Sequence, residues 1–277
     1  MLILEDLSLL LYCTVMIFIC GTVLGSFLNC AAWRIAHQES VLHGRSHCPV
    51  CGHPLGALDL VPIFSWLFLK GKCRYCQAPV SVRYPLTELF MGSMFVLALF
   101  RFDLSPLLFR NLFLLCCLFT LSLVDLEIYE IPDGALLAAA LVWLLYGLIF
   151  EKPAEELFPG LLAGFLIAGA VLLLSLVMDK VLHRESMGGG DIKLIFVCCL
   201  YLGLAAGLFM LILSCIFGLI AAAAGKRKGN SPADNQQNEG DAVPYGAFPF
   251  GPSISLAAWF MLTLGAPFVT WYLSLLG

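Results

Sequence analysis

"LLLYCTVMIFICGTVLGSFLNCA", residues Leu9–Ala31, contains no charged side chain and is long enough to cross a bilayer as an α-helix. The rest of the chain has the same character. Its 277 residues are 61% hydrophobic and 12% charged, with a mean hydropathy of +0.94. Soluble domains carry about 25% charged residues, so the composition excludes that class and predicts a polytopic membrane protein. Trp33 and Arg34 follow the run where a signal peptide would have its cleavage site, so we expect a retained helix.

Apolar runs of similar character recur along the chain. We expect eight membrane spans, with seven as the alternative count, because two of the runs are short. The runs are Leu9–Ala31, Thr87–Phe100, Leu107–Val124, Gly134–Phe150, Leu157–Val177, Asp191–Leu202, Ala205–Ala224 and Ser253–Leu275. The predicted fold is an all-α polytopic membrane protein of about eight transmembrane helices.

The basic residues predict the orientation of these spans. If the N-terminus lies outside, twelve of the 15 Lys and Arg residues fall on the inner side. They are Arg34, Arg45, Lys70, Lys72, Arg74, Arg83, Lys180, Arg184, Lys193, Lys226, Arg227 and Lys228. This bias agrees with the positive-inside rule and contradicts the inverse orientation.

Two of the inner segments are long. The first, residues 32–85, contains turn residues, charges and four cysteines, and we expect a small cytoplasmic subdomain there. The second, Gly225–Phe250, is polar and is expected to be flexible. The chain then divides into a first transmembrane helix (1–31), a zinc-binding tetracysteine segment (32–85) and a transmembrane core with helices 2–8 (86–277). No internal repeat is evident.

The first inner segment contains two C-x-x-C pairs, Cys48/Cys51 and Cys73/Cys76, separated by 21 residues. Two such pairs can surround one tetrahedral ion, with spacing close to that of zinc ribbons. Four thiolates close the coordination sphere, so this zinc would fold the segment and would not activate water. Redox-active or unligated cysteines are the alternative. A ligand from His43, His47 or His53 is a second alternative.

Carboxylates cluster where apolar runs end or begin. Asp125 ends one run, Asp133 follows Pro132 at the start of the next, and Asp191 opens a later one after three glycines. Asp133 and Asp191 both have an alternative reading as helix N-caps. Asp125 does not, because it lies at a helix C-terminus, where the macrodipole disfavours an anion. An ionisable residue at membrane depth is a candidate functional residue by default.

Asp125 and Asp191 could form a catalytic pair at the inner membrane face. Two adjacent carboxylates share a proton, so one can activate a water while the other protonates a leaving amine. Neither residue lies in a D-T-G or D-S-G sequence, so helix packing would have to bring them together. The glycines Gly188, Gly189 and Gly190 would leave space beside the Asp191 carboxylate and allow a sharp turn.

Six sequence blocks together resemble the type IV prepilin peptidase family of G-x-G-D membrane aspartic peptidases. They are "GSFLNCAAWR" (25–34), the four cysteines, "RYPLTE" (83–88), Asp125 with "IPD" (131–133), "GGGDIK" (188–193) and "PFGPSIS" (249–255). The resemblance implies an eight-helix bundle in the bacterial inner membrane with its active site facing the cytoplasm. It implies that Asp125 and Asp191 are catalytic.

The resemblance also implies an activity and its partners. The expected reaction is removal of the basic leader from type IV prepilins and prepilin-like secretion subunits. Full-length members also methylate the new N-terminus with S-adenosylmethionine, and Gly71 matches a glycine associated with that activity. Gly188, Gly190, Lys193 and Asp133 are expected to support the active site. Lys193 could tune the pair or contact lipid phosphate. Membrane lipid is an expected partner and nucleic acid is not.

Overall fold

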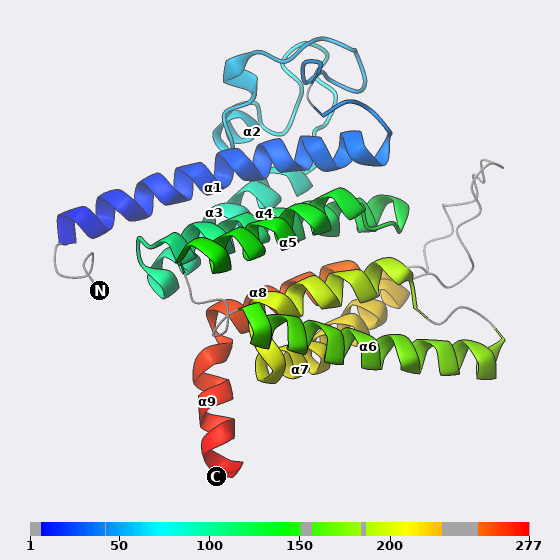
Figure 1. Cartoon of the computed structure of the whole chain (residues 1–277). Helices are drawn as coiled ribbons and strands as arrows, with labels where there is room; N and C mark the ends of the chain where they lie inside the picture. The colour runs from blue at the N-terminus through cyan, green and yellow to red at the C-terminus, as the bar shows by residue number, and fades with distance from the viewer. Residues whose placement is uncertain (1–6, 42, 151–156, 184–186, 229–248, 277) are drawn as a thin grey trace. The chain divides into compact units, whose positions relative to one another are not determined.

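The computed structural model describes residues 7–41, 43–150, 157–183, 187–228 and 249–276 (Figure 1). Most of the polar segment 225–250, expected to be flexible, lies outside these residues. The elements are α1 (Leu7–Ala36), the 3₁₀ helix η1 (Ala57–Asp59), α2 (Phe64–Phe68), α3 (Arg83–Phe102), α4 (Pro106–Ile128), α5 (Asp133–Phe150), α6 (Leu157–Leu182), α7 (Gly189–Lys228), α8 (Gly251–Thr263) and α9 (Gly265–Leu276). The described part of the chain is therefore helical, as its composition predicts.

Six of these helices, α1 and α3 to α7, are long and apolar enough to cross a membrane. The helix α7 holds two of the predicted spans, and its backbone leaves helical geometry at Gly203, with φ 72° and ψ −175°. A Cβ on Gly207 would lie only 3.0 Å from the Cys199 sulfur. These residues would be about 12 Å apart along a straight helix, so α7 folds back on itself at Gly203.

The α7 fold-back makes two antiparallel spans of one helical segment (Figure 1). The fold class predicted from sequence is thereby confirmed. One detail differs, because the last predicted span, Ser253–Leu275, is interrupted at Leu264 between α8 and α9. Gly265 and Pro267, which follow the interruption, were its signal in the sequence.

The chain forms two compact units, Met1–Val124 and Asp125–Gly277. In the first unit, α1 and α3 approach closely through glycines. A Cβ on Gly21 would lie 2.9 Å from the Gly92 Cα, and one on Gly25 would lie 2.9 Å from the Met91 Cβ. Small residues at this spacing allow two membrane helices to pack backbone against backbone. The cysteine segment connects these two helices.

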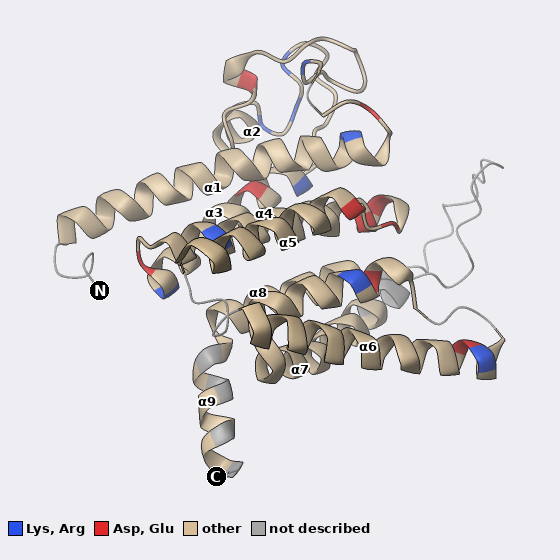
Figure 2. Ribbon diagram, viewed as in Figure 1, with Lys and Arg blue, Asp and Glu red and all other residues tan. Residues whose placement is uncertain are grey.

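The second unit packs in the same way around α7. A Cβ on Gly164 of α6 would lie 2.9 Å from the Phe196 ring, and one on Gly218 of α7 would lie 2.8 Å from the Phe250 ring at the start of α8. Figure 2 shows that the charged residues of this unit lie toward helix ends. These contacts hold α6 and the start of α8 against α7, whose first turn carries Asp191.

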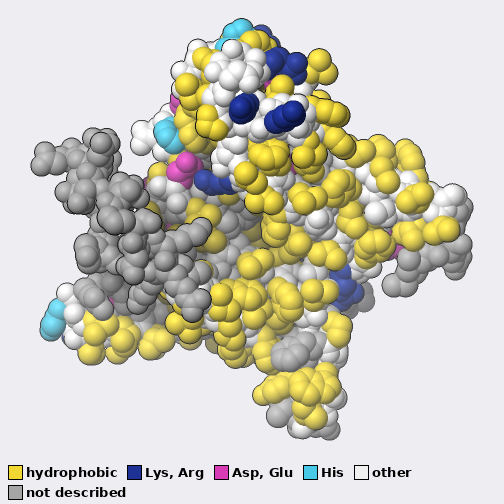
Figure 3. Space-filling model, turned by 180° about the vertical axis from the view of Figure 1, so that it is seen from behind, with side chains coloured by type: hydrophobic (Ala, Val, Ile, Leu, Met, Phe, Trp, Pro, Cys, Tyr) yellow, Lys and Arg dark blue, Asp and Glu magenta, His cyan; other side chains and the backbone are white. Residues whose placement is uncertain are grey.

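Many large apolar side chains on the membrane-spanning helices are exposed, among them Leu145, Leu148 and Ile149 of α5 and Leu173 and Leu174 of α6. Hydrophobic side chains cover much of the face seen in Figure 3. A soluble protein rarely exposes apolar surface on this scale, whereas a bilayer covers it. The surface thus supports a multi-pass membrane protein.

Candidate functional site

The first predicted catalytic residue, Asp125, lies in the last turn of α4 and is 5% exposed. Its Oδ2 accepts a hydrogen bond of 2.9 Å from the backbone N–H of Gly251, the first residue of α8. The end of α4 disfavours an anion, but the start of α8 carries the opposite partial charge. The contact between α4 and α8 therefore explains how the Asp125 carboxylate is accommodated. In the sequence, Gly251 belongs to the "PFGPSIS" block, and nothing there connects it with Asp125.

The second predicted catalytic residue, Asp191, is the third residue of α7 and is partly buried. Its backbone N–H donates to the Gly188 carbonyl at 3.1 Å, and Gly188 is the residue that precedes the helix. The N-cap reading of Asp191 is therefore wrong, because the N-cap position belongs to Gly188. The Asp191 side chain still lies in the first turn, where a helix favours an anion.

The structure places the two aspartates in the same compact unit. Asp191 and Asp125 are close enough for their carboxylates to interact electrostatically. They are 66 positions apart in the sequence and lie at ends of different helices, α7 and α4. Two like charges held this close in a partly buried site favour a shared proton. The arrangement has the chemistry that an acid–base pair needs.

The three glycines before Asp191 have different surroundings. A Cβ on Gly190 would lie 3.0 Å from the Ile131 Cβ, one on Gly188 would lie 3.6 Å from the Asp191 Oδ2, and one on Gly189 would meet nothing within 4 Å. None of the three has a positive φ angle. The expected sharp turn therefore needs no glycine-specific conformation. Gly190 allows close packing against Ile131, and Gly188 leaves space beside the Asp191 carboxylate.

The two charged residues predicted to support the site, Lys193 and Asp133, form an ion pair. The Lys193 Nζ lies 2.8 and 3.0 Å from the two Asp133 carboxylate oxygens. Asp133 is the first residue of α5 rather than the residue before it, so it is not an N-cap in the strict sense. Both side chains are more than half exposed, so the pair contributes little stability. It lies at an apolar groove of about 630 Å³ lined by α5, α6 and α7.

The four predicted metal ligands come together in the first unit. The sulfur atoms of Cys48, Cys51, Cys73 and Cys76 all lie within 4.8 Å of one another, and the group includes no histidine. The Cys48 and Cys76 sulfurs are 3.8 Å apart. A tetrahedral ion with metal–sulfur bonds of about 2.3 Å has its ligands about 3.8 Å apart, so the donor set fits a metal ion. Among the described residues, the histidine-ligand alternative finds no support.

The two C-x-x-C pairs lie in loops built in the same way, contrary to the expectation of no internal repeat. In the first loop, Cys48 N–H donates to the His53 carbonyl and Gly52 N–H to the Cys48 carbonyl. The second loop repeats both bonds 25 residues later, from Cys73 to Ala78 and from Gln77 to Cys73. The repeat was missed because only the cysteines and a following proline, Pro54 or Pro79, are shared in the sequence.

The backbone of the first cysteine loop favours a thiolate at Cys48. The N–H groups of Cys51 and Val50 point at the Cys48 sulfur and lower the pKa of that thiol to about 6. A thiolate is the form that binds a metal ion. Burial and the neighbouring cysteines Cys51, Cys73 and Cys48 raise the pKa of Cys76 to about 12, so it is the geometry of the four sulfurs together with the Cys48 thiolate that suits a cation.

Gly71, the residue linked by resemblance to methylation, begins the second cysteine loop. Its φ angle is +68°, and a Cβ there would lie 2.8 Å from the Trp66 Cζ2. The indole is held in place because its Nε1 donates to the Val80 carbonyl at 3.0 Å. Any side chain at position 71 would therefore displace the Trp66 ring or the loop.

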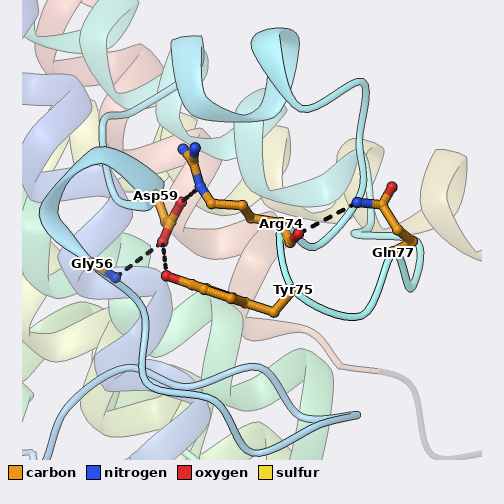
Figure 4. Close-up of polar contacts among 5 residues, drawn as sticks. All are labelled: Gly56, Asp59, Arg74, Tyr75 and Gln77. Carbon is orange, nitrogen blue, oxygen red and sulfur yellow. Dashed lines mark hydrogen bonds and ion pairs between the residues drawn. The ribbon is translucent and has the colours of Figure 1, made fainter.

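A polar cluster ties the two cysteine loops to the segment between them (Figure 4). The buried Asp59 carboxylate accepts from the Arg74 Nε at 2.6 Å, from the Gly56 N–H at 3.1 Å and from the Tyr75 hydroxyl at 3.4 Å. The Arg74 guanidinium lowers the pKa of Asp59, so the carboxylate is ionised at neutral pH. The Tyr75 ring also lies 3.6 Å from the ring of His53, which joins the second loop to the first.

Other polar residues attach the cysteine segment to α1 and α3 and join these two helices to each other. The buried Glu88 accepts from the Ile63 N–H at 2.7 Å, and Asn29 donates to the Thr87 hydroxyl. The buried Arg34 donates to the carbonyls of Ser40, Val41 and His43. These residues belong to the "GSFLNCAAWR" and "RYPLTE" blocks, so both blocks have a clear role in holding the segment to the helices.

Comparison with known proteins defines the class to which this fold and site belong. Residues 19–102 match the model for the bacterial peptidase A24 N-terminal domain, and residues 112–223 match that for the type IV leader peptidase family. The chain is a membrane peptidase with two family domains in succession. No solved structure matched it.

Similar curated proteins give the family more narrowly. The prepilin leader peptidase/N-methyltransferase of Myxococcus xanthus is 33% identical over 241 residues, which cover 83% of this chain and 70% of that protein. The protein of the same description from Bacillus subtilis is 30% identical over 265 residues, or 94% and 97% of the two chains. The type 4 prepilin-like proteins leader peptide-processing enzyme of Escherichia coli is 32% identical over 257 residues, or 85% and 88%. The chain belongs to the prepilin leader peptidase/N-methyltransferase family.

Proposed function

We propose that this enzyme is an aspartic endopeptidase of the bacterial inner membrane that removes the leader of type IV prepilins and prepilin-like secretion subunits. The observation that carries the proposal is the pairing of Asp125 and Asp191 within one compact unit. Helix packing alone brings these residues together.

In the proposed reaction, one carboxylate of the pair takes a proton from a water molecule as the water oxygen attacks the scissile carbonyl carbon. The other carboxyl group donates its proton to the leaving amine as the C–N bond breaks. The products are the leader with a free carboxylate end and the mature subunit with a new N-terminal amine. The pair returns to its single shared proton, so the cycle balances.

The distribution of basic residues supports an active site at the cytoplasmic face. Asp125 ends α4, Asp133 begins α5 and Asp191 begins α7, so the three residues belong to helix ends that the basic-residue count assigns to the inner side. A prepilin is itself a membrane helix with a basic leader, so its cleavage point would wait at this same face. Exposed acidic residues there, Glu127 and Glu130, would attract the leader.

We propose zinc as the ion of the four-cysteine group, because four thiolates in a closed tetrahedron are typical of structural zinc. The cysteines would hold the ion, and the ion would supply cross-linking of a segment that has little apolar core. For the second activity we propose S-adenosylmethionine as the methyl donor. We connect the cysteine segment with that activity through Gly71.

The proposal is tested by replacing each aspartate alone. We expect Asp125→Asn and Asp191→Asn each to abolish leader cleavage of a purified prepilin, because neither half of the pair can complete the proton transfers alone. Both variants should still insert and still methylate a peptide that begins at the mature N-terminus. Normal cleavage by either variant would show that the pair is not catalytic.

A further inference from the structure

We propose that Gly251 is a positioning residue for the peptidase reaction, and that its backbone N–H orients the Asp125 carboxylate. The inference rests on the proposed catalytic role of Asp125. It assigns a function to the start of α8, which otherwise has none in the reaction. The residues involved all lie within the second compact unit.

Among the first four residues of α8, Gly251 is the one whose backbone N–H donates outside the helix. The first four N–H groups of a helix have no partner inside the helix proper. Here the second of these residues is Pro252, which has no N–H, and the N–H groups of Ser253 and Ile254 both donate to the Phe250 carbonyl. The Gly251 N–H remains, and it donates to the Asp125 Oδ2 at 2.9 Å. The sequence Phe-Gly-Pro-Ser thus directs a single donor at a single carboxylate oxygen.

The same contact explains why position 251 holds glycine. A Cβ there would lie 2.7 Å from the Asp125 Oδ2 and 3.2 Å from its Cγ. The φ angle at Gly251 is not in the left-handed region, so the backbone conformation does not require glycine. The requirement comes from the carboxylate, which approaches the backbone too closely for any side chain.

Packing on the far side keeps this donor in place. The Phe250 ring contacts α7 at Gly218, where a Cβ would lie 2.8 Å from the ring. Since α7 also carries Asp191 at its other end, one helical segment supports both members of the pair. The hydrogen bond to Oδ2 restrains the orientation of the Asp125 carboxylate.

The test is Gly251→Ala in the full-length enzyme, assayed in nanodiscs on a purified prepilin. We expect kcat for cleavage to fall about 100-fold with KM within about two-fold of normal, because the reacting group moves while substrate binding does not change. Methylation of a peptide that begins at the mature N-terminus should persist in the same preparation. A structural defect would lower both activities together.

Gly134→Ala is the matched control, because Gly134 lies in the first turn of α5 and a Cβ there meets nothing within 4 Å. It should leave both activities unchanged. A second variant places glycolic acid at position 251 by cell-free synthesis, which turns the amide into an ester and removes the N–H without adding a methyl group. It should show the same selective loss of kcat.

The outcomes separate this inference from the proposed function. If Asp125→Asn abolishes cleavage but the ester variant cleaves at the normal rate, Asp125 is catalytic and the positioning role is wrong. If Asp125→Asn itself cleaves normally, the proposed function fails first. A Gly251→Ala protein that loses methylation as well as cleavage would overturn the positioning role unless the ester variant shows the selective loss.

Discussion

The contact between Gly71 and Trp66 gives a prediction whose size follows from the structure. Replacing Gly71 by alanine has two costs. A non-glycine residue at φ +68° costs about 1–2 kcal/mol, and forcing a methyl group to 2.8 Å from the Trp66 ring adds about 1–3 kcal/mol. The ring cannot easily move aside, because its hydrogen bond to Val80 holds it. The expected total is about 2–5 kcal/mol.

Gly52 provides the matched control in the other cysteine loop. Its φ angle is +69°, but a Cβ there meets nothing within 4 Å. Gly52→Ala therefore has only the backbone cost of about 1–2 kcal/mol. Both substitutions place a methyl group on a residue with a left-handed φ angle in a cysteine loop, so the difference between the two variants measures the contact of position 71 with Trp66.

The assay is zinc affinity, measured by competition with a chromophoric chelator on the purified enzyme. In a segment folded by its metal, the stability lost appears as weaker metal binding. Gly71→Ala should weaken zinc binding about 5- to 150-fold more than Gly52→Ala does. Methylation should fall in the same order, while leader cleavage should change little. Equal weakening by the two substitutions would refute a role for Trp66.

Two further predictions concern local geometry. Gly190→Ala should slow leader cleavage about 10-fold, because Ile131 must shift by a few tenths of an ångström beside Asp191. The control variant Gly189→Ala should cleave normally, and equal rates for the two variants would contradict this prediction. Gln77→Gly should make the enzyme retain zinc more strongly against a chelator, by about 0.5–1 kcal/mol, because Gln77 has φ +60° at the position that Gly52 occupies in the first loop. Weaker retention would show that the hydrogen bond from the Gln77 side chain to the Arg74 carbonyl stabilises the loop more than the backbone angle strains it.

The helices could be predicted because each is an apolar run of membrane-spanning length. Even the fold-back of α7 was implied by the gap between two predicted spans around Gly203. The break at Leu264 was missed, since the apolar run continues through it and only Gly265 and Pro267 mark it. Hydropathy therefore located the spans well and the interruption within a span poorly.

The residues of the candidate site could be predicted from the sequence, but contacts between residues far apart in the chain could not. Asp125, Asp191 and the four cysteines stand out in the sequence, because charges in apolar runs and paired cysteines are rare without a function. Gly251 could not be connected with Asp125, because 126 positions separate them and their hydrogen bond exists only in the folded protein. Lys193 was assigned to lipid or to the aspartates for the same reason, since its partner Asp133 is 60 positions away.

The two aspartates are held by different kinds of interaction, and this makes the pair asymmetric. Asp191 lies in the first turn of its own helix, so its position and the favourable helix dipole are both local to α7. Asp125 lies at the unfavourable end of α4 and depends on a donor from α8. The position of α8 depends in turn on the contact of Phe250 with Gly218. A change in the packing of α8 should therefore disturb Asp125 before Asp191. Since both are required in the proposed reaction, the junction of α7 with α8 is the part of the membrane core to which cleavage should be most sensitive.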